Sequence, residues 1–310
     1  MNRILVIRGG AIGDFILTLP ALKALRDTRP QAHIEILGYK HIAALVENRF
    51  YAQAVRSIES GPLARFFVSI SELPGDLADY FASFDLIISY LYDPDRIFET
   101  NVRRCGVENF ICGPARIAEN SGRAVWQLAR PIEELGIKVV DFTERVFAST
   151  EDRAFAREFL ASQSQPVIAI HPGSGSQRKN WPLENWIGLF SPERGFVNYV
   201  QLLVISGEAD ENQANELERG WKSCGVRFAK SLPLPRLAAV LERSIFIGHD
   251  SGISHLAAAA GANCILLFGP TDPDVWAPTN ENVRILQAPG QELHHLRINT
   301  VEAVLGSLLP

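Results

Sequence analysis

Short runs of consecutive apolar residues recur along the chain, and most are followed by a loop rich in glycine or small polar residues. Apolar runs of this length are typical of strands that are buried on both faces of a parallel sheet. Eight runs are predicted to be strands: residues 4–8, 34–38, 54–58, 85–89, 166–171, 201–206, 244–247 and 264–268. Segments with helical spacing or composition lie between and after them: residues 15–26, 42–47, 122–135, 151–161, 183–190, 208–222, 235–242, 253–260 and 300–309. The alternation predicts an α/β fold built on parallel sheets with helices on both faces.

The alternation begins twice, which indicates two domains. A strand, a glycine loop and a helix open the chain, and the same order restarts at residue 166 after a polar connection around residues 138–150. With 310 residues the chain is about twice the size of a typical domain. We therefore expect two Rossmann-like domains facing across a cleft, formed by residues 1–150 and 151–290. For residues 291–310 we expect a C-terminal helix that could return to the first domain.

The loops that end the predicted strands are the places to look for a ligand, because ligands of such sheets bind outside the carboxyl ends of the strands. The loops after Arg8, His171, Ser206 and Gly248 all leave such an end, and we expect them to face one cleft. Residues 92–122 give no clear pattern, since proline and glycine break them into short pieces.

Charge and cysteine content exclude some classes of protein. The formal net charge of −5 argues against a nucleic-acid-binding protein, which usually has a basic balance. The four cysteines lack CxxC spacing and Cys264 lies inside an apolar run, so a reduced, cytoplasmic compartment fits best. The N-terminus lacks the apolar core of a signal peptide, and no apolar run reaches ~18 residues. We expect a cytoplasmic protein, and peripheral contact with a membrane surface stays open.

The first candidate site lies in residues 248–270, where two apolar runs flank a glycine loop and an alanine-rich helix. Such a unit presents backbone N–H groups at a helix N-terminus, which suits an anion such as a phosphate. Its candidate contacts are Asp250, Ser251, Gly252 and His255. Asp250 could instead be an N-cap and His255 a packed core histidine, although the surrounding glycines weaken that alternative. A metal site is not expected, because the stretch offers too few ligands.

The second candidate is the loop of residues 172–182. Its hydroxyls and glycines, with Ser174 among them, resemble a phosphate-binding loop, although the GK[ST] of a P-loop is absent. Lys179 could neutralise a phosphate, with a gain of roughly 1 to 4 kcal/mol at ~4 Å depending on exposure. The alternative is a solvated loop in which Arg178 and Lys179 bind no ligand.

Carboxylates follow two further strands. Asp14 lies among three glycines in the loop or first helical turn after residues 4–8. It could be a helix cap worth ~1 kcal/mol, or a general base. No GxGxxG is present, which gives a nucleotide in this half poor support. Glu208 and Glu211 follow residues 201–206, and either could bind a ribose hydroxyl or act as a helix N-terminal acid.

Taken in order, these motifs resemble those of glycosyltransferase family 9, the ADP-heptose:lipopolysaccharide heptosyltransferases. The matching pieces span almost the full chain: Ile12-Gly13-Asp14 with Thr18-Leu19-Pro20, His171-Pro172-Gly173 with Lys179-Asn180-Trp181-Pro182, Asp250-Ser251-Gly252-x-x-His255-Leu256-Ala257-Ala258, and Phe268-Gly269-Pro270-Thr271. The resemblance implies the GT-B fold, which has two Rossmann-like domains facing across a cleft. That fold agrees with the pattern of strands and helices.

The resemblance also implies an activity, the inverting and metal-independent transfer of a heptose from ADP-heptose to a lipopolysaccharide inner-core or related glycan acceptor. No cofactor is implied. Asp14 would be the base that deprotonates the acceptor hydroxyl, and Lys179 would contact the diphosphate. The donor phosphates and sugar would be held by Asp250, Ser251, Gly252 and His255. Glu211 is the best match to the ribose-binding acid, with Glu208 second.

Other interpretations stay open at this point. A transferase with a different donor sugar, a nucleotide-sugar epimerase and a nicotinamide oxidoreductase share the architecture. A non-catalytic nucleotide-sugar-binding protein would keep the second-half motifs and have no use for Asp14. The expected partners are a nucleotide-sugar donor and a glycolipid or glycan acceptor, and the sequence does not indicate an oligomeric state. Five arginines could meet acceptor phosphates or form a solvated face: Arg96, Arg103, Arg104, Arg116 and Arg123.

Overall fold

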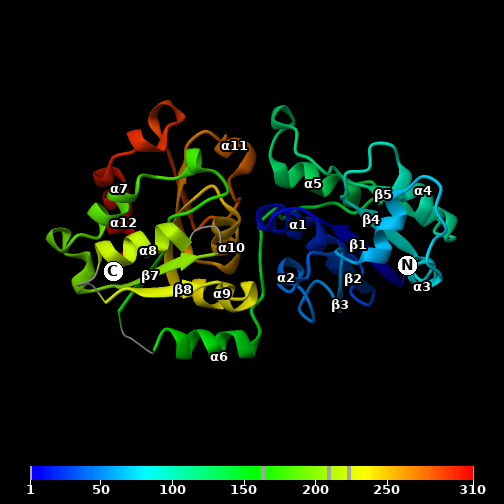
Figure 1. Cartoon of the computed structure of the whole chain (residues 1–310), viewed down its shortest axis with the longest axis horizontal. Helices are drawn as coiled ribbons and strands as arrows, with labels where there is room; N and C mark the ends of the chain where they lie inside the picture. Colours follow the sequence, from blue (N-terminus) through cyan, green and yellow to red (C-terminus); the bar gives the residue numbers. More distant parts are fainter. Residues whose placement is uncertain (1, 162–164, 208–210, 222–224, 310) are drawn as a thin grey trace. The chain divides into compact units, whose positions relative to one another are not determined.

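The computed structural model describes residues 2–161, 165–207, 211–221 and 225–309. The chain forms two compact units, Met1–Phe142 and Thr143–Pro310 (Figure 1). The first unit ends at Phe142, whereas we expected residue 150. The segment between these positions belongs to the second unit, where the Val146 N–H donates a hydrogen bond to the carbonyl of Ala259 at 2.9 Å.

The first unit contains a five-stranded sheet in the order β3-β2-β1-β4-β5. The strands are β1 (Arg3–Arg8), β2 (His33–Gly38), β3 (Ala54–Ser57), β4 (Leu86–Ser89) and β5 (Phe110–Cys112). All neighbouring pairs are parallel. The four central residues of β1, from Ile4 to Ile7, are 0% exposed, which explains why all four are apolar.

Helices accompany this sheet: α1 (Ile12–Thr28), α2 (Lys40–Ala43), α3 (Gly75–Ala82), α4 (Ile97–Arg104) and α5 (Ala124–Glu133). One core cluster joins Phe66, Phe81 and Phe98 with apolar residues of β1 and β4. The sequence pattern did not predict α3, α4 or β5. Strand β5 spans three residues, which is too short for a periodic signal.

The second unit contains a six-stranded sheet in the order β11-β10-β9-β6-β7-β8. The strands are β6 (Val167–His171), β7 (Gln201–Ser206), β8 (Arg227–Lys230), β9 (Ser244–His249), β10 (Asn263–Phe268) and β11 (Val283–Gln287). All pairs are parallel. The sequence predicted the four inner strands and missed β8 and β11. These two strands form the edges and are partly exposed, so they lack a continuous apolar run.

The helices of the second unit are α6 (Thr150–Phe159), α7 (Leu183–Leu189), α8 (Glu211–Gly220), α9 (Leu234–Leu241), α10 (Gly252–Ala260), α11 (Pro273–Trp276) and α12 (Ile298–Leu308). The C-terminal helix α12 packs against α7 and β10 (Figure 1). Its Val301 and Leu305 are fully buried in the same core cluster as Trp181 and Trp186. The structure thus assigns this helix to the second unit, and its possible return to the first domain stays a prediction.

The prediction of an α/β fold with two parallel sheets is confirmed. In each sheet the chain begins with a central strand, β1 or β6, and later strands are added on both of its sides. The point where the strand order changes direction lies between β1 and β4 in the first sheet and between β6 and β9 in the second. A crevice at such a point is the usual ligand site of an open α/β sheet. Among the described residues, no helix has the length and apolarity that a membrane span requires.

Candidate active site

The loops that follow β6 and β9 leave the second sheet side by side. His171 at the end of β6 is paired in register with Gly248 near the end of β9. Gly248 has to be small, since a Cβ at this position would lie 2.7 Å from Cζ of Phe246, whose ring is fully buried. The loop of residues 172–182 and the start of α10 therefore meet at the point where a ligand is expected.

Lys179 and Asp250 meet directly at this edge. The Lys179 Nζ lies 2.7 Å from Oδ2 of Asp250, and the two side chains are 30% and 10% exposed. The His255 Nε2 lies 4.0 Å from the other carboxylate oxygen of Asp250, and this histidine is 4% exposed. The structure thus brings together three of the residues that the sequence indicated. Asp250 holds the lysine in place, which leaves that ammonium group partly accessible to a second anion.

Ser251 and Gly252 begin helix α10. Ser251 is the N-cap, and its Oγ accepts a hydrogen bond from the backbone N–H of Ser254 at 3.4 Å. The same Oγ lies 3.4 Å from Nδ1 of His171 at the end of β6. Gly252 is the first helical residue, where the helix itself offers no acceptor for the backbone N–H. These contacts orient the positive end of the helix dipole beside the pair formed by Lys179 and Asp250.

Ser174 shapes the loop of residues 172–182. Its Oγ lies 2.8 Å from the carbonyl oxygen of Ser176 and 2.7 Å from Oδ1 of Asn180. It also accepts a hydrogen bond from the Ser176 N–H at 3.3 Å. The hydroxyl group of Ser174 is therefore engaged within its own loop, and a contact with a phosphate would require it to exchange one of these partners.

His249 is a site residue that the sequence reasoning missed. It is 0% exposed, and its Nε2 accepts a hydrogen bond from the backbone N–H of Trp181 at 2.8 Å. Because a backbone N–H can only donate, the ring proton belongs on Nδ1, which lies 3.5 Å from the carbonyl oxygen of Gly173. The available signal was a histidine as the last residue of an otherwise apolar strand. His249 joins β9 to both ends of the loop that carries Lys179.

The acidic residues after β7 are only partly described. Glu211 is the first residue of α8, at the carboxyl end of the strand as the sequence predicted. Nothing is described of its side chain, and Glu208 lies outside the described residues. The choice between these two acids stays a prediction.

In the first unit, Asp14 lies in the first turn of α1. Its Oδ2 accepts a hydrogen bond from the Ala11 N–H at 3.1 Å, as expected of a helix cap, and its side chain is 35% exposed. Arg8, the last residue of β1, is 4% exposed and places Nη2 3.7 Å from Oδ1 of Asp14. Arg8 also donates hydrogen bonds to the Asp14 carbonyl at 3.0 Å and to Oγ1 of Thr18 at 3.1 Å.

In the sequence, Arg8 served only to mark the end of the first predicted strand. Burial lowers the pKa of Arg8, while the Asp14 carboxylate and Tyr90 act in the opposite direction. Gly10, with φ of +94°, leaves room for the Asp14 carboxylate, because a Cβ there would lie 2.9 Å from Oδ2. The buried arginine and the glycine turn therefore hold a partly exposed carboxylate at the carboxyl end of β1.

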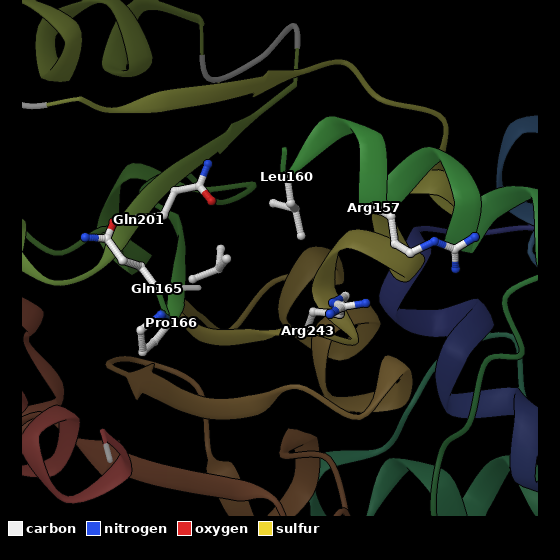
Figure 2. A pocket seen from close by; sticks show the side chains of 7 residues that line it. Arg157, Leu160, Gln165, Pro166, Gln201 and Arg243 are labelled. Atoms are coloured by element: carbon white, nitrogen blue, oxygen red, sulfur yellow. The ribbon is translucent and has the colours of Figure 1, made fainter. Parts of the chain in front are cut away.

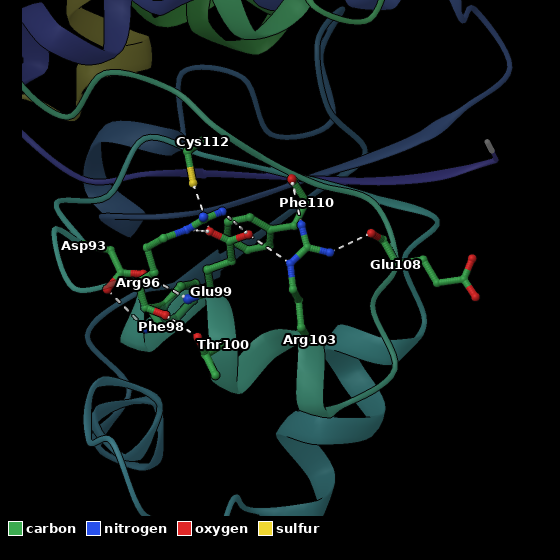
Figure 3. Close-up of polar contacts among 9 residues, drawn as sticks. All are labelled: Asp93, Arg96, Phe98, Glu99, Thr100, Arg103, Glu108, Phe110 and Cys112. Carbon is green, nitrogen blue, oxygen red and sulfur yellow. Dashed lines mark hydrogen bonds and ion pairs between the residues drawn. The ribbon is translucent and has the colours of Figure 1, made fainter.

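Two of the five arginines singled out in the sequence, Arg96 and Arg103, share one carboxylate partner in the first unit. Arg96 and Arg103 both point to the carboxylate of Glu99 (Figure 3) and form ion pairs with it at 2.8 and 2.9 Å. Burial acts to raise the pKa of Glu99, but the hydrogen bonds from the two arginines outweigh it, so the pKa is lowered. Burial and the nearby Glu99 raise the pKa of Cys112 to about 11, which makes this thiol a poor nucleophile. Both ion pairs are local to α4, and hydrogen bonds from Cys112 to Glu99 and from Arg103 to the Phe110 carbonyl join this network to β5.

A cavity of about 300 Å³ lies at the amino ends of strands β6 and β7 in the second sheet. It is lined by Arg157, Leu160, Gln165, Pro166, Val167, Gln201 and Arg243. Figure 2 shows the two arginines on one side of this cavity and the two glutamines on the other. Val167 and Gln201 are the first residues of β6 and β7, so this cavity is far along the strands from the loops with Lys179 and Asp250. It does not belong to the candidate active site.

Comparison with known proteins gives a family and a fold. A family model described as glycosyltransferase family 9 (heptosyltransferase) matches residues 124–304. The lipopolysaccharide heptosyltransferase 1 of Escherichia coli O18:K1:H7 is 30% identical over 159 residues, which cover 49% of this chain and 47% of that protein. The lipopolysaccharide heptosyltransferase 3 of Escherichia coli is 23% identical over 291 residues, which cover 87% of this chain and 84% of that protein.

The solved structure of the E. coli ADP-heptose LPS heptosyltransferase II is similar along the whole chain. Its TM-score is 0.80 at 15% sequence identity, and the match covers 99% of this chain and 98% of that one. At this identity the likeness shows the fold alone. The expected α/β fold of the GT-B type, with two Rossmann-like parallel-sheet units, is confirmed.

Proposed function

Since the chain belongs to glycosyltransferase family 9 and is a glycosyltransferase, we propose that it transfers a heptose from ADP-heptose to a lipopolysaccharide inner-core or related glycan acceptor. We further propose that the transfer inverts the anomeric centre and needs neither a metal ion nor another cofactor. The observation that carries this proposal is the pair of Lys179 and Asp250 beside the N-terminus of α10, at the point where the strand order of the second sheet changes direction.

The second unit supplies the charge that the donor requires. As the glycosidic bond breaks, negative charge develops on the leaving ADP, and stabilisation there lowers the barrier. Lys179 and the N–H groups at the start of α10 provide positive charge without a metal. A lysine ~4 Å from a phosphate charge contributes roughly 1 to 4 kcal/mol, depending on its exposure. Asp250, Ser251, Gly252 and His255 are proposed to hold the donor phosphates and sugar, with Ser174 as a further contact.

The proposed base is Asp14. Its carboxylate is partly exposed and is held by the Ala11 N–H and by the buried Arg8. A positioned carboxylate can accept the proton of the acceptor hydroxyl while that oxygen attacks the face of the sugar opposite to the leaving group. This single displacement inverts the configuration.

The ribose contact is proposed to come from Glu211, with Glu208 as the second choice. Glu211 starts the helix that follows β7, and a carboxylate at such a position commonly binds ribose hydroxyls. We also propose that the protein acts in the cytoplasm, with peripheral contact with the inner membrane surface, because its proposed acceptor is part of a glycolipid. The family resemblance supports these two points.

The test is a donor and acceptor screen followed by mass spectrometry. ADP-heptose and the corresponding ADP-hexoses are each incubated with truncated inner-core acceptors, and ADP affinity is measured separately by calorimetry. We expect a product heavier by one heptose and saturable binding of ADP. Saturable ADP binding without transfer to any acceptor would contradict the activity, and transfer of a hexose instead would correct the donor.

A further inference from the structure

The segment between β11 and α12 is anchored by buried apolar residues. Leu293 is 2% exposed and lies under Gly269, where a Cβ would come within 3.0 Å of its Cγ. Leu296 is 4% exposed, and its carbonyl accepts a hydrogen bond from Nε1 of Trp181 at 2.8 Å. A short 3-10 turn, Leu293–His295, begins at the first of these anchors. The backbone is thus tied to the second unit while the polar side chains beside the anchors face solvent.

Three metal-ligating side chains gather on this segment. One ligand atom from each of Glu292, His294 and His295 lies within 4.8 Å of the other two, and all three residues are exposed. The His294 Nε2 is 3.1 Å from Oε2 of Glu292, and the centroids of the two imidazole rings are 4.0 Å apart. Among the residues that the structure describes, no other group of three such side chains meets this criterion.

A backbone contact supports one of these ligands. The Nδ1 of His295 lies 3.2 Å from the carbonyl oxygen of Pro289. When Nδ1 carries the proton of that hydrogen bond, Nε2 presents its lone pair outward. A histidine that binds a metal almost always donates its other N–H to a carbonyl or carboxylate in this way, which fixes the ring and its tautomer. The second imidazole, that of His294, already contacts the carboxylate of Glu292, and the two residues belong to the same short segment.

We propose a binding site for a divalent transition-metal ion, preferentially Zn²⁺, formed by the side chains of Glu292, His294 and His295. Two imidazoles and one carboxylate suit Zn²⁺, Co²⁺ or Ni²⁺, whereas Mg²⁺ and Ca²⁺ prefer oxygen ligands alone. Three protein ligands leave a coordination position for water or for a group from another molecule. The sequence-based expectation of no metal site considered the residues around Asp250, whereas this proposal concerns another part of the second unit.

The site is separate from the proposed chemistry of transfer. Lys179, Asp250 and Asp14 do not belong to the cluster, and the proposed transfer needs no metal. Because binding is measured with the metal alone, without donor or acceptor, a failure of this proposal and a failure of the proposed activity are distinguishable.

The experiment uses the full chain with its affinity tag removed and with metals stripped by a chelator. Co²⁺ is titrated while its visible absorption is followed, and Zn²⁺ affinity is measured by competition with a chromogenic chelator. We expect saturation at one equivalent per chain. The single variants His294→Ala, His295→Ala and Glu292→Gln are each expected to bind Zn²⁺ at least roughly tenfold more weakly.

Two control variants make the result specific. His41→Ala removes an exposed histidine of α2 in the first unit, and Cys112→Ser removes an exposed thiol, and both are expected to bind Zn²⁺ as the parent does. Far-UV circular dichroism checks that all variants are folded. The proposal is overturned if the parent shows no saturable binding, or if either control weakens binding as much as His294→Ala does.

Discussion

At the scale of single residues, His249 and Asp250 at the end of β9 both contact the loop of residues 172–182. One does so from the buried side of the loop and the other near the surface. His249 is fully buried and accepts the hydrogen bond of the Trp181 N–H, whereas Asp250 is partly exposed and pairs with Lys179. Successive side chains of an extended chain point in opposite directions, which lets adjacent residues make contacts of both kinds. The loop is therefore fixed from inside the unit while its lysine stays accessible.

The contribution of His249 can be measured by chemical unfolding. His249→Ala leaves the buried Trp181 N–H without this acceptor, so we expect the free energy of unfolding to fall by about 1–3 kcal/mol. His249→Gln supplies a side-chain oxygen that can accept this hydrogen bond, so we expect a smaller decrease in the free energy of unfolding. The exposed His41→Ala serves as a control, with a change within about 0.5 kcal/mol. Equal losses for the alanine and glutamine variants would show that packing, rather than the hydrogen bond, matters.

The role of Asp14 is tested by Asp14→Asn, which keeps the size of the side chain and removes its basicity. We expect kcat for heptose transfer to fall by roughly 10²–10⁴-fold, the usual contribution of a general base, while ADP affinity stays unchanged. Asp27→Asn, on the same helix but paired with Lys23 at the surface, is the matched control. Steady-state kinetics and calorimetry check both quantities. Turnover by Asp14→Asn equal to that of the parent would remove the base assignment.

At the scale of elements, the junction of β9 and α10 depends on close packing around Gly248. A Cβ there would approach the Phe246 ring at 2.7 Å and Oγ of Ser254 at 3.0 Å. We expect Gly248→Ala to lower the free energy of unfolding by about 1–3 kcal/mol, measured by urea titration, because the buried ring has to move. Gly207→Ala at the end of β7 meets nothing within 4 Å and should be nearly neutral. A similar loss in both variants would contradict this explanation.

The network that joins α4 to β5 gives a pH-dependent prediction. The pKa of Glu99 is lowered from 4.5, so its contribution to stability is present above that value and is lost as the pH falls through the folded-state pKa. We expect Glu99→Gln to be less stable than the parent at about pH 6, and the difference to narrow at about pH 3.5. Urea unfolding at both pH values checks this. Glu108→Gln removes an exposed carboxylate nearby and should show no such narrowing, whereas a pH-independent difference for Glu99→Gln would contradict the ion-pair account.

At the scale of the whole molecule, each unit has its own parallel sheet and buried core, and the proposed chemistry is divided between them. The second unit offers positive charge to the donor from Lys179 and α10, and the first unit offers the carboxylate of Asp14. This division assigns no step to a metal ion, although a metal is proposed to bind elsewhere on the second unit.

Chelation tests whether the proposed transfer proceeds without a metal ion. We expect the rate of heptose transfer to be unchanged in excess EDTA, because a lysine and a helix N-terminus supply the charge that a metal would otherwise provide. The rate is measured by mass spectrometry with and without chelator, and the protein stripped of metal for Co²⁺ titration provides the same comparison. Loss of transfer that a divalent ion restores would contradict metal independence.

The sequence by itself determined the strands that are buried on both faces. Such a strand has to be apolar at nearly every position, so β1, β6, β9 and β10 were predicted from continuous apolar runs. The glycine loops after them indicated the strand ends where we propose that the donor binds. The partly exposed edge strands β8 and β11 and the short β5 carry no such requirement and were missed. Local patterns therefore predicted the fold class and the loops of the site, together with Asp14, Lys179 and Asp250.

Only the tertiary structure decided which of these residues meet. Lys179 and Asp250 are 71 residues apart, and they form a pair because the sheet places β6 beside β9. The same strand order brings His249 to the Trp181 N–H, which is 68 residues away in the chain. The packing of α12 on α7 likewise depends on an apolar face that has no preferred partner until the core forms. Contacts between distant residues depend on strand order and core packing, and a local pattern of apolar and polar positions contains no information on either.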